Sequence, residues 1–297
     1  KHSTYRNIRQ NKTQIVSNVV SVTYGIALNG IGEKISQKID EFLQTGKLKK
    51  LENIHHDETA QAISLLARIS GIGPVKAAEL AKSGIKTIED LRNHKSKLNH
   101  HQLIGLKYFE DFEKKIPREE VENIEKLLKQ HICNVDSEFV VTICGSYRRG
   151  KAESGDIDVL ITHPTFKMNK KKIKDGDNFM KNVVGSLNFL VTDVISLGET
   201  KFMGVCQLSK DLPFRRLDIR LIPCEQYYCA ILYFTGSDVF NKTMRTHALE
   251  HGFTLNEYCL RPIGVTGVPG DAVPISSEKE IFDYIDYPYK KPDQRNM

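Results

Sequence analysis

The sequence predicts an α+β fold in which two helical units precede a mixed β-sheet unit and a small α/β unit. Three observations support this order. The first half carries a repeated helical pattern, residues 139–223 change to the two-residue period of strands, and the pattern becomes mixed after residue 224. The length of 297 residues also exceeds that of one typical domain.

The helical half contains an approximate repeat. Residues 28–54 and 69–93 each run from an apolar residue through a Gly-Ile-Gly turn into an amphipathic helix. In the second copy, Pro74 stands where a first helical turn tolerates proline. Thr87 and Asp90 form a capping-box pattern for the next helix, with Asp in place of the usual Glu or Gln. The repeat therefore predicts two similar turn-helix elements.

A sheet is expected after the helical half. A helix with early acidic residues should run from Pro117 to about Cys133. Residues 166–178 are expected to be a solvated loop, and a nuclear-import patch is the alternative for NKKKIKDG, residues 169–176. The predicted strands are residues 139–145, 156–162, 188–196, 202–208 and 215–223.

The last part of the chain is expected to be mixed. Residues 237–252 predict a helix that ends at Gly252, and Ser277 with Glu280 predicts the start of a final helix. Modest linker signals place the unit boundaries near residues 54, 117 and 224. The expected units are 1–53, 54–116, 117–223 and 224–297.

Composition narrows the class of partner. The formal net charge of +6 is a mild excess that fits a polyanionic partner. No apolar run approaches the roughly eighteen residues of a membrane span, and nothing resembles a secretory signal, so no membrane partner is expected. The six cysteines form neither a CxxC pair nor a zinc spacing, which indicates buried thiols in a reducing compartment.

Residues 145–160, GSYRRGKAESGDIDVL, place arginines close to spaced aspartates. Asp156 and Asp158 lie two apart on a predicted strand, so their carboxylates share one face about 7 Å apart. Asp218 alternates with apolar neighbours on the last predicted strand and supplies a third carboxylate. Carboxylates in this arrangement suit two Mg²⁺ ions that also bind substrate phosphates.

Anion-binding groups lie next to this acidic cluster. Gly145 and Ser146 end a strand and are expected to open a short helix, where backbone N–H groups and Arg149 hold an anion. The arginines would then bind a triphosphate, and the aspartates would bind the metals attached to it. A lone DxD motif on a strand is common and usually has no catalytic role. The prediction therefore depends on the combination of this motif with the GSxxRG segment and Asp218.

The GS-x-x-RG segment followed by a DxD strand resembles the signature of the nucleotidyltransferase superfamily. Further segments resemble the DNA polymerase beta family, also called family X, over nearly the whole chain. They are CGSYRRG, SGDIDVLITHP, GETKFMGVCQL, RRLDIRLIP, YFTGSDVFNKTMRTHAL and GFTLNEY. The resemblance implies a helical lyase domain, a helix-hairpin-helix DNA-binding subdomain, a nucleotidyltransferase palm and a nucleotide-selection subdomain, in the order of the four units.

The resemblance implies a template-directed, gap-filling DNA polymerase of base excision repair. Its expected partners are gapped or nicked DNA with a 5′-phosphate, a dNTP and other base-excision-repair proteins, and it is expected to be a nuclear monomer. Asp218 would help the metal that activates the primer 3′-OH, while Asp156 and Asp158 bridge both metals. The dNTP-binding residues would be Gly145, Ser146, Arg149, Ser154, Gly155, Tyr233, Phe234, Gly236, Asp238 and Asn241.

Asp238, Asn241 and Arg245 recur at i, i+3 and i+7, on one stripe of a predicted helix. A solvated polar face is the alternative. The resemblance implies that the stripe faces the nascent base pair, with Arg245 towards the template, and that Arg216 also contacts DNA. The backbone of Tyr233 would crowd a ribose 2′-OH, which predicts a preference for deoxynucleotides.

The Gly-Ile-Gly turns resemble helix-hairpin-helix elements, which contact DNA phosphates without reading sequence. The resemblance implies that the turns also hold a monovalent cation, Na⁺ or K⁺, on backbone carbonyls. The DNA-contacting glycines would be Gly30, Gly32, Gly71 and Gly73. The carbonyls would be those of Ile26, Leu28 and Ile31 in the first turn and of Ala67, Ile69 and Ile72 in the second.

A second activity is implied, a 5′-deoxyribose phosphate lyase with Lys38 as Schiff-base nucleophile. Neighbouring Lys34 and the positive end of the helix both disfavour a protonated amine there. Lys1, Tyr5 and Lys34 would bind the 5′-phosphate. The chain departs from the family here, because the front of the domain is expected to be missing and residues 17–30 are more apolar. A basic DNA-facing surface is the alternative.

Two other functions stay open. A template-independent, terminal-transferase-like nucleotidyltransferase would share the GS and DxD parts but would not need the hairpin turns or the stripe of Asp238, Asn241 and Arg245. A DNA-end-binding scaffold with a weak active site is the non-enzymatic alternative, and three carboxylates argue against it.

Overall fold

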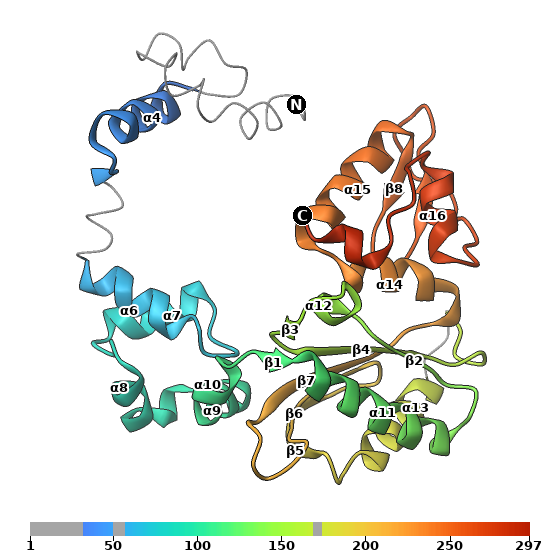
Figure 1. The fold of residues 1–297 in the computed structure, drawn as a ribbon, viewed down its shortest axis with the longest axis horizontal. Coiled ribbons are helices and arrows are strands. Elements are labelled where there is room, and N and C mark those ends of the chain that lie inside the picture. The colour runs from blue at the N-terminus through green and yellow to red at the C-terminus, as the bar shows by residue number, and fades with distance from the viewer. Residues whose placement is uncertain (1–31, 50–56, 169–173) are drawn as a thin grey trace. The chain divides into compact units, whose positions relative to one another are not determined.

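The computed structural model describes residues 32–49, 57–168 and 174–297 (Figure 1). The chain divides into two compact units, Lys1–Lys95 and Ser96–Met297. Lys1, Tyr5, Ile26, Leu28, Gly30 and Ile31, for which site roles are expected, lie outside the described residues.

The first unit is helical, as expected. Its helices are α4 (Glu33–Thr45), α6 (Glu58–Leu66), α7 (Pro74–Lys82) and α8 (Ile88–Asn93), and the short 3₁₀ helix η1 (Lys95–Lys97) follows at the boundary. The helix starts agree with the sequence signals. Pro74 lies in the first turn of α7, and the side chains of Thr87 and Asp90 form the predicted capping box of α8.

The sequence repeat is also a repeat of backbone conformation. Gly32 precedes α4 with φ −86° and ψ 170°, and Gly73 precedes α7 with φ −82° and ψ 172°. The helices are followed by Gly46 and Gly84, whose φ values of 69° and 87° lie in the left-handed region that glycine tolerates. The second glycine of each Gly-Ile-Gly turn therefore introduces a helix in the same way.

The second unit is built on a five-stranded mixed sheet. The strand order is β2-β4-β7-β6-β5, and β4 and β7 are parallel whereas the other neighbours are antiparallel. The strands are β2 (Val140–Ile143), β4 (Ile157–Thr162), β5 (Val191–Leu197), β6 (Lys201–Cys206) and β7 (Arg215–Leu221). All five predicted strands are confirmed, with ends that shift by up to three residues.

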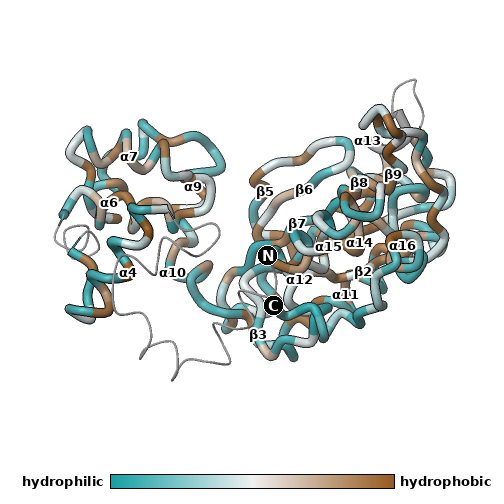
Figure 2. Tube along the Cα trace, turned by 90° about the horizontal axis from the view of Figure 1, so that it is seen from above, coloured by the Kyte–Doolittle hydropathy of each residue, from teal (hydrophilic) through white to brown (hydrophobic). Residues whose placement is uncertain are grey.

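Helices cover both faces of this sheet. On one face, α11 (Arg118–Val135) and α13 (Lys174–Ser186) bury a large apolar core against β2, β4, β6 and β7 (Figure 1). On the other face, Leu160 of β4 packs with Ala230 and Ile231 of α14 (Tyr227–Thr235). In Figure 2, hydrophilic and hydrophobic residues alternate along most elements, as expected for elements that bury one side.

The second unit also contains shorter elements before and between the strands of this sheet. The helices α9 (His100–Lys107) and α10 (Phe109–Phe112) precede it, and the two-residue strands β1 (Ile116–Pro117) and β3 (Glu153–Ser154) pair with each other. The four-residue helix α12 (Gly145–Arg148) follows β2 directly. This is the short helix that the sequence predicted after Gly145.

The C-terminal part packs around its own apolar cluster, which includes Phe240, Met244 and Phe282. The predicted helices are α15 (Asp238–Glu250), which is followed by Gly252 with φ 76°, and α16 (Glu278–Tyr284), which is capped by Ser277. The remaining elements are η2 (Cys224–Gln226), the hairpin of β8 (Phe253–Leu255) and β9 (Leu260–Pro262), and η3 (Pro292–Arg295).

The prediction of a loop over residues 166–178 is wrong for the last part of that segment. Helix α13 begins at Lys174, although residues 169–173 lie outside the description. Met180, Val183 and Val184 of α13 belong to the buried core. Packing of that apolar face stabilises a helix that the polar composition of its first turn does not indicate.

The cysteines agree in part with the prediction of buried thiols. All six are free, and Cys144, Cys206 and Cys229 are buried. Cys133 is exposed, because it follows the core residue Ile132 on α11 and therefore leaves the buried face. Among the described residues, no helix is long and apolar enough to cross a membrane.

Candidate active site

Strand register brings the predicted carboxylates together. Asp158 and Asp218 are direct partners in the parallel ladder between β4 and β7, and Asp156 lies in the bend just before β4. Leu217 and Ile219, the neighbours of Asp218, are fully buried in the core on the opposite face. The period of two therefore directs Asp218 away from the core and towards the other two aspartates.

The local contacts of Asp218 leave one of its oxygens available. Asp218 is 5% exposed, and its Oδ2 accepts a hydrogen bond of 2.7 Å from Nη2 of Arg216. Its Oδ1 is buried and accepts no hydrogen bond from the part of the chain that the structure describes. A bound divalent cation would compensate a buried carboxylate oxygen that has no hydrogen-bond donor. The three aspartates therefore fit a Mg²⁺ site.

Burial and the closeness of the carboxylates also shift the pKa values of two of the aspartates. Burial raises the pKa of Asp158 to about 7, and the negative charges of Asp156 and Asp218 contribute. Burial likewise raises the pKa of Asp156, assisted by Asp218 and opposed by Arg216. Like charges held close together favour a bound cation or a bound proton. The electrostatics of the site therefore agree with the binding of divalent ions.

We expect Asp158→Asn to stabilise the metal-free protein at alkaline pH. Because the folded-state pKa of Asp158 lies above its ordinary value of 3.8, the carboxyl destabilises the fold increasingly as the pH rises from about 4 through 7. The variant should therefore melt higher than the wild type at pH 8 in EDTA, by a few degrees, and equally near pH 4. Thermal melts across this range measure the difference. Asp211→Asn, at an exposed residue, is the control, and a difference independent of pH would contradict the expectation.

Gly145 allows the chain to pass close to the carboxylates. Its φ of +61° is in the left-handed region, and a Cβ placed on it would lie 3.2 Å from Oδ2 of Asp158. Ser146, the next residue, donates a hydrogen bond of 3.1 Å to the hydroxyl of Ser154, while Gly155 is exposed beside Asp156. Glycine thus keeps the space between α12 and Asp158 open.

Arg149 joins the acidic site to the C-terminal part. Its Nη1 donates to the carbonyl of Thr235 at 2.6 Å, and its Nε donates to Oδ1 of Asn296 at 3.0 Å. Gly236 also has a positive φ of +68°, and a Cβ there would lie 3.2 Å from Nη1 of Arg149. The structure thus brings the predicted dNTP-binding residues near 149 and near 236 together.

The neighbouring arginine belongs to a buried network that sequence reasoning missed. Arg148 donates to both carboxylate oxygens of Glu278, at 3.2 and 2.9 Å. Glu278 also accepts from Arg295, which is completely buried, at 2.5 Å. The partners lie 130 and 17 residues apart, and no local pattern connects them. This network ties α12, α16 and η3 together.

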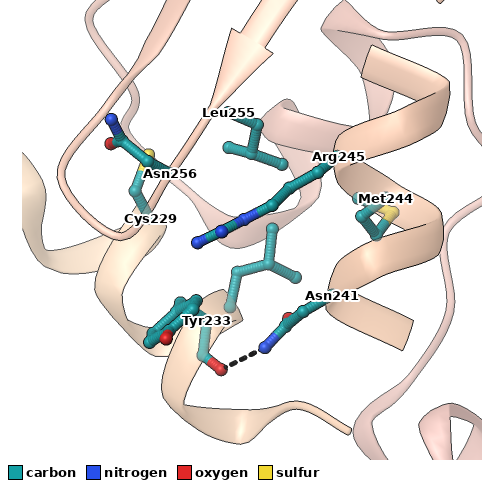
Figure 3. Close-up of a pocket in the computed structure, with 8 residues that line it drawn as sticks. Cys229, Tyr233, Asn241, Met244, Arg245, Leu255 and Asn256 are labelled. Carbon is teal, nitrogen blue, oxygen red and sulfur yellow. Dashed lines mark hydrogen bonds between the residues drawn. The ribbon is translucent and has the colours of Figure 1, made fainter. Parts of the chain in front are cut away.

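The stripe on α15 borders a small pocket. Asn241 donates to the carbonyl of Tyr233 at 2.7 Å, and the guanidinium of Arg245 lies 5.0 Å from the centre of the Tyr233 ring. Figure 3 shows both side chains pointing from α15 towards Tyr233. The pocket residues are Cys229, Leu232, Tyr233, Asn241, Met244, Arg245, Leu255 and Asn256.

Two other members of the predicted set, Phe234 and Asp238, are not among the residues that line this pocket. Phe234 packs beside Tyr233 with ring centres 5.0 Å apart, and the guanidinium of Arg220 lies 4.7 Å from the Phe234 ring. Asp238 is exposed and pairs with Lys242 at 2.8 Å. Glu257, which the sequence did not single out, pairs with Arg245 at 3.4 Å.

The predicted DNA-contacting residues of the first unit are partly described. Lys34 and Lys38 are exposed on α4, one turn apart. In the second Gly-Ile-Gly turn, Gly71 has a φ of +86°. The carbonyl of Ile69 accepts the N–H of Ile72 at 2.9 Å and keeps a second lone pair.

Three family models match consecutive parts of the chain. The fingers domain of DNA polymerase lambda matches residues 64–113, the DNA polymerase beta palm matches 115–224, and the DNA polymerase beta thumb matches 230–296. The acidic cluster lies entirely within the palm match.

Curated relatives are similar along nearly the whole chain. DNA polymerase lambda of Arabidopsis thaliana is 36% identical over 286 residues, which are 91% of this chain and 53% of that protein. DNA polymerase lambda of Rattus norvegicus is 34% identical over 292 residues, 94% of this chain and 49% of that protein. DNA nucleotidylexotransferase of Xenopus laevis is 26% identical over 299 residues, 90% of this chain and 58% of that protein. The chain spans about half the length of these relatives.

Proposed function

The chain belongs to the family X DNA polymerases, and on that premise we propose that it fills gaps in DNA by template-directed nucleotidyl transfer. A primer 3′-OH would attack the α-phosphate of a dNTP and expel pyrophosphate. The observation that carries the proposal is the pairing of Asp158 with Asp218 in the ladder, with Asp156 in the bend just before β4. Within the described residues, one buried oxygen of Asp218 accepts no hydrogen bond.

Two Mg²⁺ ions are the proposed cofactors, held by the three aspartates. When bound, they would stabilise the attacking and leaving oxygens of the displacement. Asp218 is the proposed ligand of the ion that would activate the primer 3′-OH. Arg216 binds one of its oxygens, which leaves the other for the ion. The closeness of the three carboxylates favours the binding of cations.

Arg149, Gly145 and Ser146 are the proposed triphosphate ligands, with Ser154 and Gly155 beside them. Arg149 uses two of its nitrogens in bonds to Thr235 and Asn296, and a guanidinium carries five N–H donors. Its remaining donors can therefore hold phosphate without breaking the link to the C-terminal part.

Tyr233, Phe234, Gly236, Asp238 and Asn241 are the proposed contacts to sugar and base, and Arg245 the proposed contact to the template strand. The bond from Asn241 to the Tyr233 carbonyl supports this grouping, because it holds the end of α14 against α15. The same backbone would crowd a ribose 2′-OH, which favours deoxynucleotides.

We propose the DNA contacts and unit boundaries as the sequence predicts them, with Na⁺ or K⁺ at the two helix-hairpin-helix turns. The matching backbone at Gly32 and Gly73 supports two equivalent turns. The proposed units are 1–53, 54–116, 117–223 and 224–297. Base excision repair in the nucleus, as a monomer with other repair proteins, is the proposed setting.

Primer extension on three substrates tests the function. A labelled primer at a one-nucleotide gap with a 5′-phosphate, on an open template and as a bare single strand is offered each dNTP separately with Mg²⁺. We expect strong filling of the gap by the nucleotide that the template dictates and weaker extension elsewhere.

A template-independent transferase is the second candidate, because the chain is 26% identical to a DNA nucleotidylexotransferase. Extension of the bare strand, or indifference to the template base, would favour it and would reject gap filling. If no substrate shows metal-dependent addition of a nucleotide, the DNA-end-binding scaffold is the function that remains.

We also propose that Lys38 forms a Schiff base with a 5′-deoxyribose phosphate, and its exposure on α4 supports access by DNA. Borohydride should trap a covalent DNA adduct of the wild type and of Asp218→Asn. The Lys38→Ala variant should lose at least 90% of this adduct. Lys82→Ala, at an exposed lysine of α7, is the control. An undiminished adduct in Lys38→Ala would assign the nucleophile to another amine.

A further inference from the structure

A second group of metal-ligating side chains lies on the palm, away from the three aspartates. Asp136 and Glu138 lie in the turn between α11 and β2, and His163 directly follows β4. Asp158 is at the start of β4, so the rise of a strand separates it from His163 by about 16 Å. The group is therefore too distant to share an ion with the candidate active site.

The three side chains converge on one point. Nε2 of His163 lies 3.2 Å from Oδ2 of Asp136 and 3.9 Å from Oε2 of Glu138. The ligand atoms of all three lie within 4.8 Å of one another. His163 is 3% exposed, whereas the side chain of Glu138 is 62% exposed and has room to adjust. A buried imidazole thus faces two carboxylates at the protein surface.

The imidazole is held rigidly but lacks a hydrogen bond on the side of the carboxylates. Its Nδ1 lies 2.7 Å from the hydroxyl of Thr165, and the rings of Phe139 and Phe179 lie 5.0 and 4.9 Å from its own. Its Nε2 is buried and makes no hydrogen bond within the described residues. If Nδ1–H donates to Thr165, the lone pair of Nε2 points towards Asp136 and Glu138, which is the orientation of a metal-binding histidine.

The charges around the group favour a cation. Within the described ranges, the ion-pair contacts of Asp136 and Glu138 are with His163 alone. The N–H of Glu138 donates to Oδ1 of Asp136 at 2.9 Å, which leaves Oδ2 of Asp136 facing His163. Asp136 is thus held in place, and two carboxylates face one imidazole ring.

We propose that Asp136, Glu138 and His163 form a site for a first-row transition ion of the Zn²⁺ type, which ties the α11–β2 turn to the end of β4. One imidazole nitrogen with two carboxylate oxygens suits Zn²⁺ better than Mg²⁺, which prefers oxygen ligands alone. Tetrahedral bonds of 2.0–2.1 Å place ligand atoms about 3.3 Å apart. The contact between His163 and Asp136 has this length, and a rotamer change of exposed Glu138 brings in the third ligand.

The alternative is a plain histidine–aspartate pair. The N–H of Thr165 also lies 3.3 Å from Nδ1 of His163, and if it donates there, Nε2 carries the proton and points it at Asp136. The pair would then fasten the turn without an ion. Zinc binding distinguishes the two arrangements, because the ion must replace that proton.

The experiment uses the full chain with Asp156→Asn, Asp158→Asn and Asp218→Asn, so that the candidate active site holds no metal. We expect Zn²⁺ to bind one to one and to raise the melting temperature. Co²⁺ in its place should give visible d–d absorption without a thiolate charge-transfer band. Added separately, Glu138→Gln and His163→Gln should each weaken Zn²⁺ binding at least tenfold and remove the thermal shift.

Two control variants exclude other ligands. Cys133→Ser removes an exposed thiol, and His251→Gln breaks the pair of His247 and His251, whose rings lie 3.9 Å apart. Both should keep the full zinc response. Glu138→Gln decides the result even if His163→Gln does not fold, because Glu138 is exposed. No zinc response in the parent, an unchanged response in Glu138→Gln, or loss of the response in either control overturns the proposal.

Discussion

Asp218→Asn should lower the rate of nucleotide addition by roughly a thousandfold or more. Asparagine keeps the size of the side chain and can still accept the hydrogen bond that Arg216 donates to Asp218 at 2.7 Å. It removes the negative charge of a buried oxygen that accepts no hydrogen bond from any described residue. The loss should therefore appear in the chemical step rather than in folding.

Single-turnover filling of a one-nucleotide gap measures this effect. The rate at saturating dNTP should fall, whereas the apparent Kd for the dNTP should stay within about threefold, because the triphosphate is assigned to Arg149, Ser146 and Gly145. Asp211→Asn, an exposed aspartate in the turn before β7, is the matched control and should retain the wild-type rate. Near-normal turnover of Asp218→Asn would show that this carboxylate is not part of the machinery.

Glu278→Ala should destabilise the fold by about 3–5 kcal/mol, because buried guanidinium groups lose their carboxylate partner. Arg295 has no exposed surface, and Glu278 is its carboxylate partner as well as that of Arg148. Burial alone would raise the pKa of Glu278, but hydrogen bonds from Arg148 and Arg295 hold it below its ordinary value. The contribution of Glu278 is therefore present above its unfolded pKa and is lost as the pH falls through its folded pKa.

Urea unfolding at pH 7 and near pH 4 measures this loss, and the difference between wild type and Glu278→Ala should narrow at the acid pH. A double variant, Glu278→Leu with Arg295→Met, should lose less than Glu278→Ala, because the fully buried cation is gone. Glu280→Ala is not a suitable control, since Glu280 accepts the N–H of Ser276 at 2.7 Å. Lys279→Ala, at an exposed residue of the same helix, should be close to neutral. Equal losses in the single and double variants would contradict the role given to the buried charge.

Much of the five-stranded sheet follows from local pattern. Alternation along RRLDIRL places Leu217 and Ile219 in the core and Asp218 on the opposite face, because successive side chains of a strand point to opposite sides. Caps are equally local, and those at Thr87 and Ser277 form as predicted. The sequence could not show that Asp158 and Asp218 are direct ladder partners, since parallel pairing depends on the whole fold.

Features that depend on distant partners escaped prediction. Nothing near Glu278 indicates that it binds Arg148, and nothing near Glu257 indicates that it pairs with Arg245. Helix α14 was missed because its sequence YYCAILYFT is apolar throughout and shows no helical period. Helix α13 was missed at its start because tertiary packing outweighs the polar residues of its first turn.

The parallel ladder of β4 and β7 also limits which insertions and deletions the coding sequence tolerates. Inserting or deleting one codon within residues 157–162 or 215–221 would move every later side chain of that strand to the other face. For a change between residues 215 and 217, Leu217 or Ile219 would replace Asp218 opposite Asp158, and the carboxylate would enter the core. The length of these strands is thus constrained as well as the identity of their aspartates, whereas the turn at residues 208–213 can absorb insertions.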